Sequence, residues 1–323
     1  MTKYVHVSHV KLYDGRGKFV GGVPIFAHYL AQAIPELVQY SFADYPKWMD
    51  HDRATEPQRA EVLNAWLLET GAVDQDTVVI ADGYWGVGLE GRVGRLISVI
   101  HGSYYGRLLQ SQIYPWGEVV QMYDVTAQLA FWKQPEVELV GVCKSVVDEI
   151  MLYDKSYARA IVVNNSVPVD GDGYFPVETE GDLVAMHGAT GMIKGADNIG
   201  YMVREAGCVI ENFGISTEFA SHKRKRFSEC SFLVAPTHYE GNPYMWLEAM
   251  ACGVPVLGST VGIGREIPRT VSVMLDDRSP ANFIRWYKDM DKGRGYLDPR
   301  QWVVDNCAIE QFNAGWREIC NVS

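Results

Sequence analysis

The stretch that decides the fold is residues 236–258, PTHYEGNPYMWLEAMACGVPVLG. It places Glu240 and Glu248 eight positions apart, on either side of a Gly-Asn-Pro step that ordinarily interrupts regular structure. The apolar residues 232–235 before it predict a strand, and Pro243 suits the first turn of a helix, where its missing N–H costs nothing. Glu240 therefore lies in the loop at the carboxyl end of a strand, and Glu248 lies inside the next helix.

This arrangement predicts a ligand site, because ligands of open α/β sheets bind at the carboxyl ends of the strands. The loop holds Asn242, and the free N–H groups of the helix, beginning near Tyr244, can bind a phosphate. Carboxylates accept hydrogen bonds from sugar hydroxyls. Phosphate donors flanked by two carboxylates match a nucleotide sugar. The spacing alone is equally consistent with a helix N-terminus that carries favourably placed acids.

The composition is that of a folded protein long enough for two domains. The 323 residues are 47% hydrophobic, and the net charge of −11 argues against a general nucleic-acid binder. No apolar run approaches the ~20 residues that span a bilayer, so we expect no integral membrane segment. Six scattered cysteines without a CxxC pair favour reduced thiols and a cytoplasmic location.

Short β-branched runs alternate with helix-like segments, which predicts parallel sheets covered on both faces. The predicted strands are 4–10, 37–42, 77–81, 96–101, 137–142, 160–163, 182–187, 209–213, 232–235, 254–257 and 271–274. The predicted helices are 23–34, 57–70, 144–153, 197–206, 217–229, 243–251 and 279–290.

The alternation stops at residues 164–181, NNSVPVDGDGYFPVETEG, which have the composition of a linker. We therefore predict an α/β protein of two Rossmann-like domains, 1–165 and 166–305, followed by a closing C-terminal segment at 306–323. Apolar residues at helical spacing within 309–320 place the closing helix there. The basic run HKRKR at 222–226 is interpreted as the solvated face of a surface helix.

The pattern E-x7-E followed by AMACGVPV resembles the retaining glycosyltransferases of the GT-B fold, above all family 4, the glycosyl transferases group 1. Weaker similarities lie at 140–150 (VGVCKSVVDEI), 162–167 (VVNNSV) and 187–195 (HGATGMIKG). The resemblance implies a GT-B architecture, in which two Rossmann-like domains face an interdomain cleft that binds the sugar donor.

The resemblance also implies residue roles. Glu240 would contact the transferred sugar, Glu248 the ribose hydroxyls and Lys194 the diphosphate. Lys194 makes chemical sense by itself, because a cation opposite a leaving diphosphate stabilises the charge that develops there. The family's loop arginine aligns with Ala189 here, so either another cation replaces it or the site is weaker or degenerate. Arg265, in the turn after the next strand, is the candidate replacement.

In the first domain, the glycine-rich stretch from Gly15 to Gly22 resembles the family's first loop, where bare backbone amides approach the donor phosphate and the acceptor. His101 ends a predicted strand at a place where the family often has a histidine near the transferred sugar, which makes it a candidate catalytic residue beside Glu240 and Lys194. Asp82, at the end of another strand, is a candidate acceptor contact by position alone.

Two other kinds of site are not expected. GVGLEG at 86–91 is a formal GxGxxG, but the dinucleotide fingerprint requires a helix at once and an acid further on. Here RVGR and another strand come next instead. No His, Cys and Asp cluster has the spacing of metal ligands. We therefore expect no metal and no cofactor besides the donor.

The sequence thus predicts a metal-independent retaining glycosyltransferase that moves a hexosyl or pentosyl group from a nucleotide-diphosphate sugar, with UDP the expected nucleotide, to an acceptor hydroxyl. A glycan or small soluble acceptor is the first choice, and a hydroxymethylated phage DNA base is the second. A GT-B sugar-nucleotide epimerase and a degenerate binding scaffold are the alternatives. The oligomeric state is left open. The acceptor choice rests on aromatic residues of the first domain: Tyr45, Trp48, Tyr84, Trp85, Tyr104, Tyr105, Tyr114 and Trp116.

Overall fold

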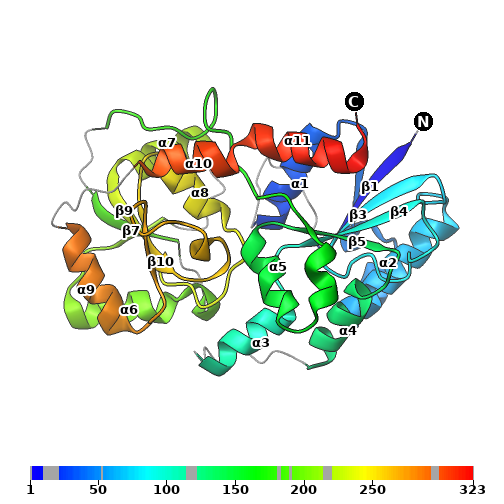
Figure 1. Ribbon diagram of the computed structural model, residues 1–323, viewed down its shortest axis with the longest axis horizontal. Coiled ribbons are helices and arrows are strands. Elements are labelled where there is room, and N and C mark those ends of the chain that lie inside the picture. Colours follow the sequence, from blue (N-terminus) through cyan, green and yellow to red (C-terminus); the bar gives the residue numbers. More distant parts are fainter. Residues whose placement is uncertain are drawn as a thin grey trace. The chain divides into compact units, whose positions relative to one another are not determined.

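The computed structural model (Figure 1) describes residues 2–9, 22–51, 54–113, 122–179, 183–188, 191–213, 220–291 and 298–322. The chain divides into two compact units. The N-terminal unit comprises Met1–Leu108, Val119–Val163 and Asn313–Ser323, and the C-terminal unit comprises Leu109–Glu118 and Asn164–Phe312. Helices α3 (Tyr104–Ile113) and α11 (Ile309–Cys320) contain residues of both units.

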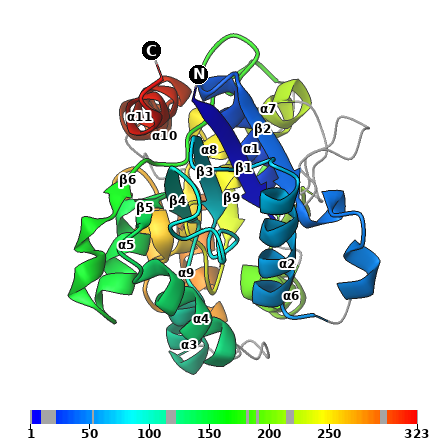
Figure 2. The same ribbon diagram turned by 90° about the vertical axis from the view of Figure 1, so that its right-hand side faces the viewer.

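The N-terminal unit is built on a six-stranded parallel sheet in the order β2-β1-β3-β4-β5-β6, seen strand by strand in Figure 2. Its strands are β1 (Lys3–Ser8), β2 (Leu37–Ser41), β3 (Thr77–Asp82), β4 (Arg95–Ile100), β5 (Val137–Gly141) and β6 (Ile161–Val162). Its other helices are α1 (Gly22–Ala33), α2 (Glu56–Glu69), α4 (Met122–Trp132) and α5 (Lys144–Met151), with the 3₁₀ turns η1 (Phe42–Asp44), η2 (Trp48–His51) and η3 (Lys155–Arg159).

Alternation of side chains along the strands gives this sheet two covered faces. On one face, Trp132 of α4 donates its indole N–H to Ser98 Oγ of β4 at 2.8 Å. On the other face, Tyr4 of β1 donates its hydroxyl to the carbonyl oxygen of Cys320 at the end of α11, at 3.0 Å. Phe26 of α1 packs edge-on against Trp316 of α11, with ring centroids 5.7 Å apart. Helices α1 and α11 therefore lie together on the face opposite α4.

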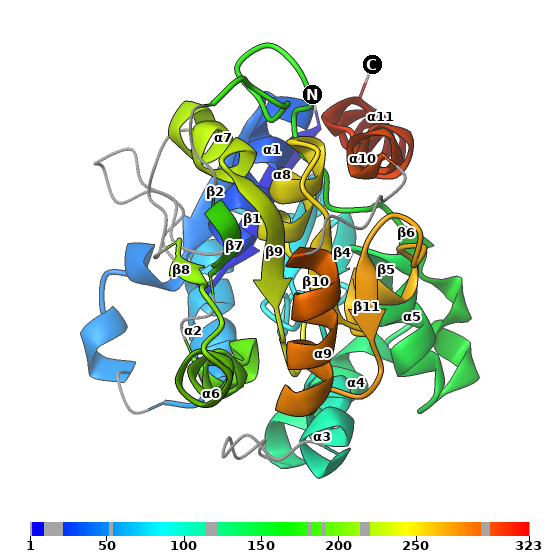
Figure 3. The same ribbon diagram turned by 90° about the vertical axis from the view of Figure 1, so that its left-hand side faces the viewer.

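The C-terminal unit has a five-stranded parallel sheet in the order β11-β10-β9-β7-β8, which Figure 3 shows from its own side. The strands are β7 (Leu183–His187), β8 (Glu211–Asn212), β9 (Cys230–Ala235), β10 (Val256–Ser259) and β11 (Val273–Leu275). The helices are α6 (Ala196–Ala206), α7 (Ala220–Ser228), α8 (Tyr244–Ala251), α9 (Pro280–Asp291) and α10 (Pro299–Cys307), with the turns η4 (Met192–Lys194) and η5 (Gly262–Arg265).

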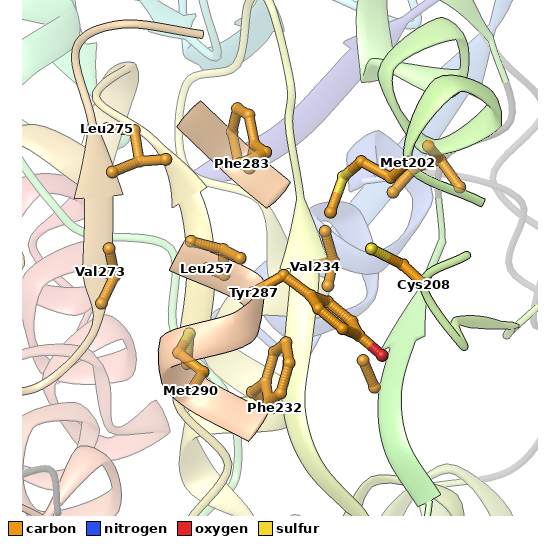
Figure 4. Packing of buried hydrophobic residues seen from close by; sticks show 12 residues of the cluster. Met202, Cys208, Phe232, Val234, Leu257, Val273, Leu275, Phe283, Tyr287 and Met290 are labelled. Atoms are coloured by element: carbon orange, nitrogen blue, oxygen red, sulfur yellow. The ribbon is translucent and has the colours of Figure 1, made fainter. Parts of the chain in front are cut away.

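The core of this unit lies between the sheet and helices α6 and α9 (Figure 4). Met202 of α6 and Phe283 of α9 are fully buried against Leu257 of β10 and its neighbours. The next residue along β10, Gly258, faces the other way, where a Cβ atom would lie 3.4 Å from the Trp246 ring of α8. Helix α8 therefore covers the opposite face of the sheet, and most of its residues are buried there.

The predicted fold class is confirmed: the chain is an α/β protein with two parallel sheets, and every predicted strand range overlaps a strand. Three helices were not predicted: α3, α4 and α10. In α3, a Cβ atom on Gly106 would lie 1.6 Å from the carboxylate of buried Glu149, so long-range packing explains a glycine that argues locally against a helix. For α10 a signal existed, since Asp298 caps it by accepting from the Gln301 N–H at 3.1 Å.

The closing helix expected in 306–323, at residues 309–320, is present as α11. The preceding α10, which was not predicted, is separated from it by Ala308, which is extended. Val167 of the linker pairs with this break, since its N–H donates to Cys307 and its carbonyl accepts from Ile309, at 3.0 and 3.1 Å. The linker thus supplies a strand-like partner that interrupts the helix.

Three smaller expectations have clear outcomes. The GVGLEG segment forms consecutive turns after β3 with no helix, so it lacks the dinucleotide-binding geometry. All six cysteines are buried, and none forms a disulfide. Within the described ranges, no helix combines the length and hydropathy needed to cross a membrane.

Candidate functional site

Glu240 lies where the sequence placed it, in the loop between β9 and α8 at the carboxyl end of the sheet. Pro243 is the N-cap of α8 and keeps extended backbone angles, so it stands just before the helix rather than in its first turn. The Glu240 side chain retains 21% of its exposure. It is thus a carboxylate at a strand end that solvent can still reach, which is the position expected of a ligand-binding group.

Lys194 comes from the loop after β7 and is brought to Glu240 by a tight contact between the two loops. Gly195 adopts a left-handed φ of +76°, and a Cβ atom there would lie 2.0 Å from the carbonyl oxygen of Pro236. The His238 N–H donates to the Ile193 carbonyl at 2.9 Å. Only glycine allows this approach.

With the loops held in this way, the ammonium of Lys194 forms an ion pair with Oε1 of Glu240. Both partners are partly exposed. The structure therefore joins two predicted catalytic residues that are 46 positions apart in the sequence.

A third loop, after β10, packs against the same segment. The Ile263 N–H donates to the Gly241 carbonyl at 2.7 Å, and a Cβ atom on Gly262 would lie 1.8 Å from that carbonyl oxygen. Arg265 ends this loop and is exposed. Strands β7, β9 and β10 are neighbours in the sheet, so their three loops place Lys194, Glu240 and Arg265 along one edge.

Asn242 and Tyr244, predicted to bind the donor, are both buried. The Asn165 side-chain amide donates to the Asn242 carbonyl at 2.8 Å, and the Asn242 amide donates back to the Asn165 carbonyl at 3.4 Å. Asn242 therefore ties the loop before α8 to the linker, so its side chain has a structural role in this structure. The contact of these two residues with a donor stays a prediction.

Glu248 is enclosed rather than open. Its side chain keeps 3% of its exposure, and its carboxylate accepts from Lys223 Nζ at 3.0 and 3.2 Å and from the Tyr174 hydroxyl at 2.8 Å. The sequence analysis did not anticipate either partner. A buried charge of this kind is normally found paired, and here the pair joins α7, α8 and the linker.

The interpretation of 222–226 as a solvated face is therefore wrong for Lys223. Lys223 and Phe227 are the buried residues of α7, one helical turn apart, and this spacing was the available signal. The neighbouring Arg224 is also engaged: its guanidinium lies 4.1 Å from the centroid of the Phe175 ring and donates to the Gly173 carbonyl at 3.0 Å. Lys225 remains exposed.

In the N-terminal unit, His101 and Asp82 come together at the carboxyl ends of β4 and β3. His101 Nε2 lies 2.8 Å from Asp82 Oδ1, and His6 Nε2 lies 3.2 Å from the same oxygen. Burial acts to raise the pKa of Asp82, but the charge of His6 and the hydrogen bond to His101 outweigh it and hold the pKa well below its usual range. Sequence reasoning found both Asp82 and His101 but did not pair them, and it missed His6.

The remaining predicted positions are the glycines of the first loop, Ala189 and the aromatic residues of the N-terminal unit. Gly22 is the exposed first residue of α1, while Gly15 and Ala189 lie outside the described residues. Of the predicted aromatic surface, Tyr84 and Trp85 are buried and Trp48 is exposed. Tyr114 and Trp116 also lie outside the described residues. In the part of the chain that is described, no group of three or more His, Cys, Asp or Glu side chains has an arrangement that could hold a metal ion.

Solved structures similar to this chain extend over its full length. Sucrose-phosphate synthase from Thermosynechococcus elongatus has a TM-score of 0.71 at 15% identity, covering 99% of this chain and 100% of that one. Anabaena HepE in complex with UDP-glucose has a TM-score of 0.71 at 10% identity, covering 100% of both. The lipopolysaccharide outer core galactosyltransferase WaaB has a TM-score of 0.61 at 14% identity, covering 99% of both. The fold is GT-B.

The GT-B assignment has a counterpart in the sequence. Residues 201–286 match the family model described as glycosyl transferases group 1, which confirms the expected resemblance over this segment. The matched segment runs from α6 into α9 and includes Lys223, Glu240, Glu248 and Arg265. Among curated proteins, none matches the chain.

The contact between Gly195 and Pro236 generates a first prediction. Gly195→Ala would meet both a left-handed φ and the Pro236 carbonyl, so it should lower the free energy of unfolding by more than the about 1–2 kcal/mol of left-handed strain alone. Denaturant unfolding measures this loss. Gly207→Ala is the matched control, because Gly207 has a φ of +65° and nothing within 4 Å of its Cβ position. Equal losses in the two variants would show that the contact is not a constraint.

The buried pair generates a second prediction. Lys223→Met and Glu248→Gln should each cost about 3–5 kcal/mol of unfolding free energy, because each leaves a buried partner uncompensated. The double variant should lose about 1–3 kcal/mol less than the two costs added together. Lys225→Met, on the exposed side of α7, should change stability by no more than about 0.5 kcal/mol. Additive losses would mean that Lys223 and Glu248 do not stabilise each other.

Proposed function

We propose that this protein is a retaining glycosyltransferase that moves a sugar from a nucleotide-diphosphate donor, with UDP as the nucleotide, to an acceptor hydroxyl. The observation that carries the proposal is the contact of Lys194 with Glu240 where the loops after β7, β9 and β10 meet. It joins a cation and a carboxylate at the sheet edge where α/β proteins bind ligands. A nucleotide sugar needs both, for its diphosphate and for its hydroxyls.

In the proposal, the pair is the ligand-free form of the site. Lys194 and Glu240 neutralise each other while no donor is bound. A diphosphate would take over the ammonium of Lys194, and the released Glu240 carboxylate would accept hydrogen bonds from the transferred sugar. Lys194 then stabilises the negative charge that develops on the leaving diphosphate, which lowers the barrier to transfer.

One lysine does not balance a diphosphate, so further groups are assigned to it. The first N–H groups of α8 point along the helix axis toward the loop that holds Glu240 and suit an anion. Arg265 offers an exposed guanidinium on the neighbouring loop. In the N-terminal unit, Gly22 opens α1 and would bring backbone amides to the phosphates or the acceptor.

In the proposal, Glu248 still binds the ribose, but through only one of its two carboxylate oxygens. Its Oε1 already accepts from Lys223 and Tyr174, whereas Oε2 accepts one hydrogen bond, from Lys223 at 3.2 Å. A ribose hydroxyl would use the remaining lone pair of Oε2. Lys223 and Tyr174 then serve to hold the carboxylate in place.

The nucleotide and the acceptor are proposed from a structural neighbour and from the net charge. HepE, a structural neighbour, was solved in complex with UDP-glucose and with UDP and glucose, which favours UDP here. A glycan or small soluble acceptor remains the first choice and a hydroxymethylated DNA base the second, since the net charge of −11 disfavours DNA. We propose transfer without metal or other cofactor, and work in the cytoplasm, where free thiols such as these six persist.

Two alternative functions use the same site differently. A sugar-nucleotide epimerase would bind the donor through Lys194 and Glu240 but need no acceptor. A degenerate scaffold would bind a ligand without turnover, and the enclosed Glu248 favours this alternative over epimerisation. Incubation of the purified protein with UDP-sugars and a panel of acceptors separates the three, because transfer, epimerised donor and unchanged donor are distinct products by mass spectrometry.

The roles of the paired residues generate a third prediction. Glu240→Gln should leave UDP affinity within about twofold but lower turnover by at least ~10²-fold, because the uncharged amide no longer stabilises charge on the sugar side. Calorimetry with UDP and a transfer assay measure the two effects. Glu205→Gln removes an exposed carboxylate of α6 and serves as the control. Absence of binding to UDP, GDP and ADP alike would refute the enzyme proposal.

The extra positive charge generates a fourth prediction. If Arg265 replaces the family's loop arginine, Arg265→Ala should lower kcat/KM about 10- to 100-fold, since a cation at the diphosphate is lost. Arg269→Ala is the control, because it removes a second exposed arginine close by in the sequence. Arg269 pairs only at the surface, with the exposed Asp276, so its loss should change kcat/KM little. Equal activity of the two variants would exclude Arg265 as the replacement.

A further inference from the structure

A second group of buried polar residues lies in the N-terminal unit, at the carboxyl edge of its sheet. His6 of β1, Asp82 of β3 and His101, directly after β4, share one oxygen atom: both imidazole Nε2 atoms lie within hydrogen-bond distance of Asp82 Oδ1, at 3.2 and 2.8 Å. The three residues come from three neighbouring strands of the sheet. The sequence analysis made His101 a candidate catalytic residue and Asp82 a candidate acceptor contact, but it gave His6 no role.

Strand register explains why these residues meet. In the parallel pairs, His6 lies beside Ile80 and Asp82 lies beside Val99. Residues two apart on a strand share a face, so His6, Asp82 and His101 project from the same side of the sheet. Phe26 of α1 packs on this side, edge-on to the His101 ring with centroids 4.7 Å apart.

The exposure of the three side chains increases from His6 through Asp82 to His101. His6 keeps 0% of its side-chain exposure, Asp82 keeps 4% and His101 keeps 22%. Asp82 is held ionised, since the partner imidazoles outweigh the effect of burial on its pKa. Within the described residues, His6 Nδ1 and Asp82 Oδ2 are buried without a hydrogen-bond partner, which is unusual for a purely structural cluster. Of these three residues, only His101 reaches the surface, so the other two can act only through it.

An ionised carboxylate accepts hydrogen bonds and donates none, and this fixes the imidazole tautomers. Each histidine must place its proton on Nε2 to bind Asp82 Oδ1. A neutral His101 then has an unprotonated Nδ1, which can accept a hydrogen bond from a hydroxyl but cannot donate one to a phosphate. The tautomer therefore selects the chemical class of ligand.

We propose that Asp82 and His6 are positioning residues that fix His101 as the Nε2–H tautomer, so that its Nδ1 accepts a hydrogen bond from a sugar hydroxyl. Asp82 orients the ring and sets its proton. His6, which is fully buried, holds the Asp82 carboxylate through the same oxygen atom, Oδ1. The inference rests on the proposed sugar transfer for its kinetic consequence, whereas the tautomer itself can be measured without any substrate.

The direct test is nuclear magnetic resonance of protein with ¹⁵N-labelled histidine, in which two-bond correlations distinguish the two neutral tautomers. His101→Gln assigns the signals. The unmodified protein should show His101 protonated on Nε2 near neutral pH, and Asp82→Asn should shift it toward a mixture of tautomers. Asp76→Asn, in an exposed turn, should change nothing. A His101 protonated on Nδ1 in the unmodified protein would overturn the proposal, even if Asp82→Asn fails to fold.

The kinetic test asks whether Asp82 acts through His101. Asp82→Asn should lower kcat about 10- to 100-fold, as removal of an orienting partner does at metal-binding histidines, while the Kd for UDP stays unchanged. The variant that combines Asp82→Asn with His101→Gln should be no slower than His101→Gln alone. Multiplied losses would show that Asp82 acts independently and contradict the proposal. If the unmodified protein transfers no sugar, the proposed function fails, but the tautomer measurement still decides this inference.

Discussion

The contact between Gly195 and the Pro236 carbonyl is the constraint on which the C-terminal site depends. It holds the loops after β7 and β9 closer than any residue with a Cβ atom would permit. Gly262 does the same for the loop after β10 by approaching the Gly241 carbonyl. Because both glycines lie in loops at one edge of the sheet, Lys194, Glu240 and Arg265 share that edge without any of them belonging to the hydrophobic core. The chemistry of the site is therefore positioned by backbone contacts.

Each unit also buries charged side chains, and the two clusters differ in what they leave accessible. Lys223 and Tyr174 both donate to the buried Glu248 carboxylate, so their main effect is to fasten α7 and the linker to α8. In contrast, Asp82 binds both the buried His6 and the partly exposed ring of His101. A satisfied buried pair stabilises a framework, whereas a buried carboxylate with one exposed partner directs that partner's hydrogen bonds.

Charge balance connects these observations to the proposed function. Lys194 and Glu240 together contribute no net charge, and Lys223 is neutralised by Glu248. In the proposed site, the N-terminus of α8 and Arg265 would supply the positive potential that a diphosphate needs beyond Lys194. A donor site of this kind would depend strongly on Arg265, because it has little positive charge in reserve.

The sequence by itself determined the α/β class, the eleven strands and the strand-end positions of Glu240, His101 and Asp82, because periodicity and local turn residues report on the neighbouring backbone. It also determined the resemblance to group 1 glycosyltransferases that the match over 201–286 bears out. Only the tertiary structure decided that Lys223 is buried against Glu248, that His6 joins Asp82, and that Gly106 lies inside a helix beside Glu149. These outcomes depend on pairs of residues far apart in the chain, and a local pattern carries no information about the partner that will neutralise a charge or fill the space beside a glycine.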